Sequence, residues 1–162
     1  MKIIFYMLIG ILLSCNGNSP ENLLEEAKLM RSENKIKETI ISLRSIIKRY
    51  PAHDLAAKSQ FMIADMYLND VKDYNFSIEE FQKSIKFYPD HEVAKNSLFM
   101  IAYIYNNYLN SYTDAINSYN LFIKKYPEDE LIPSVKYELR GLFDIEAVID
   151  SLNLIVNQKN NI

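Results

Sequence analysis

The stretch KSIKFYPDHEVAKNSLFMIAYIY, residues 83–105, holds a Tyr-Pro pair, a short polar turn and a long apolar run. Nearly the same arrangement occurs 38 residues earlier and again 38 residues later, because Tyr-Pro pairs stand at residues 50–51, 88–89 and 126–127. Further columns keep this spacing: Ile40, Ile78 and Ile116; Leu43, Phe81 and Tyr119; Ile47, Ile85 and Ile123. A fixed period of this length indicates stacked supersecondary units.

Each period predicts two helices, because its apolar residues recur at helical spacing on both sides of a polar turn such as residues 69–73. Proline ends the second helix, since it lacks an N–H group and disfavours helix in the residue before it. The polar residues that follow, Asp54 and the run 90–92, supply acceptors and negative charge for the next helix start.

The pattern resembles the tetratricopeptide repeat, a helical hairpin of about 34 residues. The second period matches its signature positions with Gln60, Ile63, Ala64, Tyr67, Ser77, Phe81, Ser84 and Pro89. The third matches them with Leu98, Ile101, Ala102, Tyr105, Ala115, Tyr119, Phe122 and Pro127. The resemblance implies an all-α fold, a short right-handed superhelix of about 3.5–4 antiparallel hairpins.

The predicted hairpins cover about residues 21–49, 54–87 and 91–125, followed by a capping hairpin over 129–157. In this last unit we expect Gly141 to end one helix and Asp144 to start the next. Ile145, Val148, Ile149, Leu152 and Ile155 predict an amphipathic final helix, and residues 158–162 are expected to be a disordered tail.

The first fourteen residues predict a signal peptide, with Lys2 before an apolar run that is too short to span a bilayer. The only cysteine, Cys15, closes this segment, and the polar residues 16–20 read as a flexible tether. The segment resembles a bacterial lipoprotein signal, which implies cleavage before Cys15, a diacylglyceryl group on its sulfur and an acylated amino terminus. Asn16, in place of aspartate, favours the outer membrane. The alternative is an ordinary signal peptide, or an uncleaved anchor, with an incidental cysteine.

Composition excludes some classes of function. The net charge of −3 gives no basic field for nucleic acid. Three glycines, at Gly10, Gly17 and Gly141, cannot build a phosphate-binding loop. His53 and His91 stand one period apart, so we expect helix-start residues and no shared metal. No recognisable catalytic set occurs, and acidic pairs such as Glu79-Glu80 are predicted to be solvated; we therefore expect neither an enzyme nor a cofactor besides the lipid.

A partner-binding groove is predicted from one aromatic column, Phe61, Phe99 and Tyr137, which in the repeat family faces the concave side. The polar and aromatic residues expected around it are Lys28, Lys58, Asp65, Asn69, Asn96, Tyr103, Asn106 and Asn107. Such a surface suits an extended peptide or a partner helix. The alternative is that the column packs against the adjacent hairpin.

Long hairpins ended by Tyr-Pro behind a lipoprotein signal are similar to two envelope families. One is the lipoprotein subunit of the outer-membrane β-barrel assembly machinery (BamD-like), and the other is the periplasmic repeat protein that works with the Tol–Pal system. The resemblance implies a lipid-anchored adaptor on the periplasmic face of the outer membrane that binds a protein partner. Barrel assembly is the leading role, with a cell-envelope or division scaffold second. The sequence is also compatible with a lipoprotein that handles peptidoglycan and with a plain structural spacer.

Overall fold

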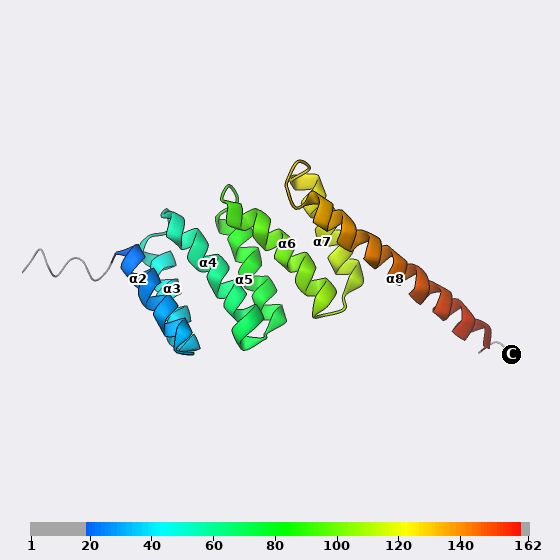
Figure 1. Ribbon diagram of the computed structural model, residues 1–162, viewed down its shortest axis with the longest axis horizontal. Coiled ribbons are helices and arrows are strands. Elements are labelled where there is room, and N and C mark those ends of the chain that lie inside the picture. The colour runs from blue at the N-terminus through cyan, green and yellow to red at the C-terminus, as the bar shows by residue number, and fades with distance from the viewer. Residues whose placement is uncertain (1–18, 160–162) are drawn as a thin grey trace, which may run out of the picture. The chain divides into compact units, whose positions relative to one another are not determined.

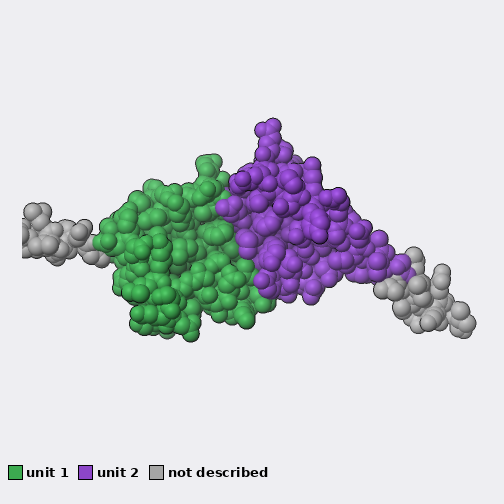
Figure 2. Space-filling view, in the orientation of Figure 1, with its two compact units in different colours: residues 1–93 green, residues 94–162 purple. Residues whose placement is uncertain are grey.

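The computed structural model describes residues 19–159 as helices joined by short turns, and none of these residues forms a strand (Figure 1). The all-α prediction is therefore confirmed. The predicted signal peptide and the cysteine predicted to be lipidated lie outside the described residues. The chain divides into two compact units, residues 1–93 and residues 94–162, which are described one at a time (Figure 2).

The first unit holds two helical hairpins. Helices α2 (Pro20–Ser32) and α3 (Ile36–Arg49) form one, and α4 (Asp54–Met66) and α5 (Tyr74–Phe87) form the other. The N-terminus of α2 is capped by Ser19, whose Oγ accepts from the Asn22 N–H at 3.2 Å, and proline occupies the first helical position, where no N–H partner is needed. These helices correspond to the hairpins predicted over residues 21–49 and 54–87.

One apolar core joins the two hairpins of this unit. It is built from buried side chains of α2, α3 and α4: Leu23, Leu24, Ala27, Leu43, Ile46, Ile63 and Met66. Because each helix presents only one apolar face, neither hairpin could bury this surface alone. The stacking that the sequence period predicts is thus a packing requirement.

The second unit holds α6 (Glu92–Asn107), α7 (Tyr112–Lys125) and α8 (Ile132–Lys159). Helices α6 and α7 form the third hairpin and correspond to the one predicted over residues 91–125. Helix α8 packs against α7 through its first turns, where Val135, Leu139 and Leu142 are buried. Figure 1 shows the rest of α8 continuing well past the ends of α6 and α7.

All three Tyr-Pro pairs end a helix with the same geometry. Tyr50, Tyr88 and Tyr126 have φ of −132°, −132° and −131° and ψ of 51°, 53° and 59°. Each then accepts a turn hydrogen bond on its carbonyl from the residue three positions later. The recurring sequence therefore encodes a recurring stop, set by the proline that follows.

The residue at the end of each of these turns caps the start of the next helix. His53 Nδ1 accepts from the Leu55 N–H at 3.2 Å, and His91 Nδ1 accepts from the Val93 N–H at 3.1 Å. The third equivalent, Asp129, accepts through Oδ1 from the Leu131 N–H at 2.9 Å. Both histidines are thus helix-start residues that satisfy a free backbone donor. The prediction assigned much of this role to the neighbouring Asp54, which instead pairs with Lys58 at 2.7 Å.

The turn inside each hairpin also repeats. Asn34, Lys72 and Asn110 are spaced by 38 residues, and they are the non-glycine residues with positive φ, at 58°, 62° and 51°, among those described. In the second hairpin a π-helical turn, η2 (Tyr67–Val71), precedes this residue. A π-turn accommodates one extra residue in a helix.

The predicted break at Gly141 is wrong. Helix α8 runs without interruption from Ile132 to Lys159, so the residues predicted as a capping hairpin over 129–157 form one helix. A single glycine costs a helix only about 1 kcal/mol, and neither a proline nor a cap follows it. Since α8 extends to Lys159, it also includes the first residues of the predicted tail.

Candidate partner-binding site

The aromatic column does not form an exposed row. In the first unit the Phe61 ring packs edge-on against Phe81 of α5, with centroids 5.1 Å apart. In the second unit Phe99 packs against Tyr119 and Phe122 of α7, at 5.9 and 6.2 Å. Both are half-buried, so each contributes to the core of its own hairpin. Tyr137, the third member, differs because 71% of it is exposed.

The polar residues predicted for the first unit are engaged in ion pairs and hydrogen bonds. Lys28 pairs with Glu25 at 2.7 Å, and Lys58 pairs with Asp54. The Asp65 carboxylate accepts from Arg31 Nη2 at 2.8 Å and from Asn69 Nδ2 at 2.6 Å.

Arg31 also donates to Asp70 at 2.7 Å, so one guanidinium joins α2 to α4 and the adjacent π-turn. Burial acts to lower the pKa of Arg31, but the hydrogen bonds to Asp70 and Asp65 outweigh it, and the pKa is raised. This cluster holds two hairpins in register.

The polar residues predicted for the second unit lie along α6. Asn107 donates to the Tyr103 carbonyl at 3.0 Å, and the Tyr103 ring lies 6.0 Å from that of Tyr108. Asn96 is half-buried. Asn106 Nδ2 donates to Glu138 Oε2 at 3.0 Å and so joins α6 to α8.

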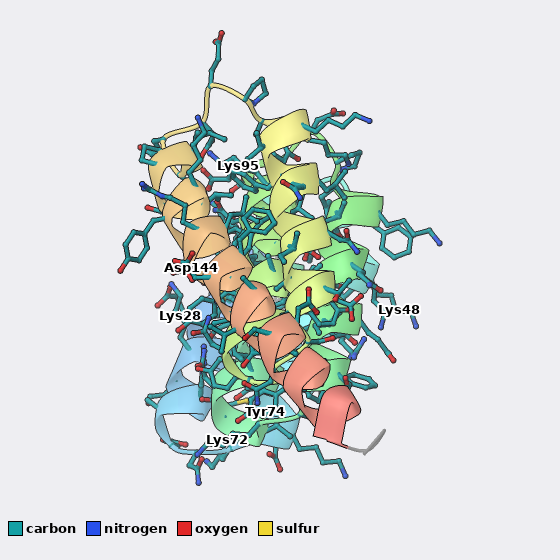
Figure 3. All side chains as sticks on the ribbon, turned by 90° about the vertical axis from the view of Figure 1, so that its right-hand side faces the viewer. Lys28, Lys48, Lys72, Tyr74, Lys95 and Asp144 are labelled. Atoms are coloured by element: carbon teal, nitrogen blue, oxygen red, sulfur yellow. The ribbon has the colours of Figure 1, made fainter. Side chains whose placement is uncertain are left out.

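A cleft of about 550 Å³ lies along α8 in this unit and is lined by Asn106, Tyr137, Glu138, Arg140, Gly141, Leu142, Asp144 and Ile145. The structure therefore brings together two of the predicted residues, Asn106 and Tyr137, and adds charged residues that the sequence did not point to. Figure 3 shows Asp144 on the flank of α8. Sequence reasoning missed Glu138 and Arg140, which stand beside Tyr137 on the same predicted helix, and it placed Asp144 on a separate helix because it ended the first one at Gly141. The apolar spacing of Tyr137, Ile145 and Val148 across the glycine was the signal for one continuous helix.

A second apolar surface lies in the first unit, where α3 meets the π-turn. A groove of about 390 Å³ is lined by Ile36, Lys37, Ile40, Ile41, Arg44, Tyr67 and Val71. Ile41 and Val71 are exposed. This groove was not predicted, because the sequence analysis used Ile40 only as a member of a repeat column.

Glu80 was predicted to be solvated, and this prediction is wrong. Its side chain is fully buried, with Oε1 accepting from Arg44 and Lys83, both at 2.8 Å, and Oε2 accepting from Gln60 at 2.7 Å. Burial acts to raise the pKa of Glu80, but the hydrogen bonds from Lys83, Gln60 and Arg44 outweigh it and lower the pKa. The carboxylate thus joins α3, α4 and α5 and is a structural group. Glu79 beside it is exposed, as predicted.

The histidines are placed by the same caps and ion pairs. His91 Nε2 lies 2.8 Å from Asp54 Oδ1, and His53 Nε2 lies 3.5 Å from Glu21. Hydrogen bonds from Lys58 and His91 lower the pKa of Asp54. Among residues 19–159 no group of three or more His, Cys, Asp and Glu side chains is arranged to hold a metal ion. Within the same residues, no helix is long and apolar enough to cross a membrane.

Residues 13–153 match the sequence family described as "SNAP: Soluble NSF attachment protein, SNAP". The chain belongs to this family. A solved structure titled "Crystal structure of MamA" is similar in fold, with a TM-score of 0.51 and 14% sequence identity, over 88% of this chain and 86% of that one. No curated protein matches the chain in sequence. Together with the hairpins described above, these comparisons show a tetratricopeptide-type helical repeat. Repeats of this type build extended surfaces for protein partners.

Proposed function

We propose that this protein is a lipid-anchored adaptor of the cell envelope, held through Cys15 at the periplasmic face of the outer membrane and binding a protein partner. The observation that carries the binding role is the cleft along α8, where the exposed Tyr137 stands beside Glu138 and Asp144. Tyrosine is among the residues that contribute most to protein binding in such surfaces. The family description, which names an attachment protein, agrees with an adaptor.

The anchor rests on the sequence before residue 19. Several acyl chains on one cysteine hold a protein at a membrane far longer than a single chain does. A tethered adaptor meets partners at the same surface at raised effective concentration, so a moderate affinity suffices. The short tether thus keeps the protein at the membrane, and the repeat surface binds the partner there. The specific role we propose is assembly of outer-membrane β-barrel proteins.

Membrane fractionation of Cys15→Ser tests the anchor. We expect the wild-type protein in the membrane fraction and the variant in the periplasmic fraction after signal cleavage. Ser14→Ala, which leaves the cysteine in place, is the matched control and should remain with membranes. Cleaved Cys15→Ser protein that still sediments with membranes would contradict the anchor.

Crosslinking of the anchored protein in its own cells, followed by identification of the crosslinked proteins, tests the adaptor role. We expect a subunit of the barrel assembly machinery among them. Crosslinks to Tol–Pal components alone would favour the envelope-scaffold role, and crosslinks to peptidoglycan alone would contradict binding of a protein partner.

A further inference from the structure

One face of α8 lacks the helix that covers the equivalent face of an earlier repeat. Two periods, 76 residues, relate Gln60, Ala64 and Tyr67 of the second hairpin to Lys136, Arg140 and Phe143. In the second hairpin all three of the former contact α5: Gln60 donates to Glu80, the Ala64 carbonyl accepts from Ser77 Oγ at 2.8 Å, and the Tyr67 ring lies 4.5 Å from Phe76. This face is therefore built to receive a second helix.

In α8 the corresponding side chains are exposed. Half of Phe143 is exposed, and Lys136 and Arg140 are exposed as well. Neither cation forms an ion pair with a described residue, although Arg140 Nε donates to the Lys136 carbonyl at 3.4 Å. Residues 132–159 do not turn back to cover the face, because they form one continuous helix that extends past the end of α6 (Figure 1). Among the described residues nothing fills the position that α5 fills in the second hairpin.

Along the same face, basic and acidic side chains are separated by position. Lys136, Arg140, Phe143, Ala147 and Asp150 recur at helical spacing and share one side of α8, and all five are exposed. The basic residues stand before Phe143 and the acidic residue after it. Lys136 and Asp150 are each seven residues from Phe143, which is about 10 Å along a helix axis.

This arrangement is complementary to a second copy of itself. We infer that two copies of the protein pair through this face of α8, with the helices antiparallel and the two-fold axis at Phe143. In this register the two Phe143 rings meet, and each Lys136 lies opposite Asp150 of the second copy. Such a contact is isologous, as a closed dimer requires. A parallel pair is disfavoured, because it would place lysine against lysine and aspartate against aspartate.

The pairing gives each α8 the second helix that its repeat lacks, as α5 does for α4. Ala147 lets the backbones approach closely on either side of the aromatic centre. The contact involves one face of a single helix over about four turns, whereas stable complexes bury roughly 800 Å² per partner, so we expect a weak dimer. The inference does not depend on the lipid anchor or on the identity of an envelope partner.

Sedimentation equilibrium of the full-length protein, in a detergent matched in density by the buffer, tests the pairing from about 1 µM to about 200 µM. We expect a concentration-dependent dimer in the wild type. Lys136→Glu and Asp150→Lys should each weaken dimerisation about tenfold or more, because each places like charges at two symmetric contacts. The double variant, which exchanges the two charges, should restore it. Lys48→Glu on α3 makes the same change of charge elsewhere and should leave it unchanged.

A disulfide trap measures the register directly. In full-length protein with Cys15→Ser, the Phe143→Cys variant should form an intermolecular disulfide on mild oxidation, because the two positions meet at the axis. Val148→Cys, also exposed on α8, should not, since its two copies lie beyond the roughly 7 Å between Cα atoms that a disulfide spans. A monomer at every concentration would overturn the inference. A dimer that Lys136→Glu leaves intact, or that the double variant fails to restore, would overturn it too.

Discussion

At the scale of single residues, equivalent positions of the repeat carry different side chains, and the difference affects stability. Phe81 and Tyr119 occupy the same column, and both are fully buried against the aromatic residue of the preceding helix in their hairpin. The Tyr119 hydroxyl is buried without a hydrogen-bond partner among the described residues. Burial, followed by the charge of Glu138 and the neighbouring Tyr103, raises the pKa of Tyr119. The buried hydroxyl therefore destabilises the third hairpin, whereas Phe81, at the equivalent position of the second hairpin, has no hydroxyl to bury.

We expect Tyr119→Phe to raise the free energy of unfolding by about 1 kcal/mol, because it removes a buried polar group that has no partner among the residues described. Urea unfolding followed by circular dichroism measures this. Tyr126→Phe, at a partly exposed tyrosine, is the control and should change stability little. A loss of stability in Tyr119→Phe would show that the hydroxyl has a partner.

Glu80 gives a prediction with a defined pH dependence. Replacement by Gln should cost about 1–3 kcal/mol at neutral pH, because a buried charged acceptor for two cations is lost. The pKa of Glu80 in the folded protein lies below its ordinary value of 4.5. Its contribution is therefore fully present above that value and is lost as the pH falls through the folded pKa.

Urea unfolding between about pH 7 and about pH 3 should show the wild type losing its advantage over Glu80→Gln toward the acid end. Glu79→Gln, at the exposed neighbour, should behave like the wild type at every pH. An advantage of the wild type that persists undiminished in acid would contradict the assigned role of the carboxylate.

At the scale of elements, the sequence predicted helix ends correctly where a proline prevents the helix from continuing. It failed at a glycine, which only weakens a helix. The three Tyr-Pro stops lie where the sequence places them, because proline removes a donor and clashes with the preceding turn. Gly141 was expected to act in the same way, but glycine only weakens a helix. The burial of Val135 and Leu139 before Gly141, and of Leu142 directly after it, stabilises α8 enough to continue.

Gly141→Ala should therefore stabilise the protein by about 1 kcal/mol and raise its helix content. The position is open, since a Cβ placed there meets nothing within 4 Å. Thermal unfolding followed by circular dichroism measures both quantities. Ala147→Gly, an exposed site in the same helix, should shift stability by a similar amount in the opposite direction. Destabilisation by Gly141→Ala would indicate that the residue is needed as a break.

At the scale of the whole molecule, the period in the sequence predicted the fold well and the candidate site only in part. Each hairpin must bury a face against a neighbour, so the columns of Ile and Phe report the architecture directly. The candidate site depends instead on which side chains the neighbouring helix leaves exposed. Phe61, Phe99 and Tyr137 look alike in sequence, yet only Tyr137 lacks a following helix of its own hairpin among the described residues.

The polar contacts between hairpins could not be predicted from the sequence for a similar reason. Arg31 pairs with residues 34 and 39 positions away, and Arg44 pairs with Glu80. These distances in sequence have no periodic signature, because each ion pair occurs once. A periodic pattern therefore predicts the scaffold, and the three-dimensional structure is needed to find the features in which one repeat differs from the next.

Hydrogen–deuterium exchange of the full-length protein, resolved to single residues by NMR, tests the central claim that one hairpin repeats along the chain and ends in a single long helix. We expect fast exchange at 38-residue intervals, in the turns after Tyr50, Tyr88 and Tyr126, with protected helices between them. Protection should continue through Gly141 and Asp144. Protected amides across the Tyr-Pro turns, or fast exchange confined to residues 141–144 within an otherwise protected α8, would contradict the account.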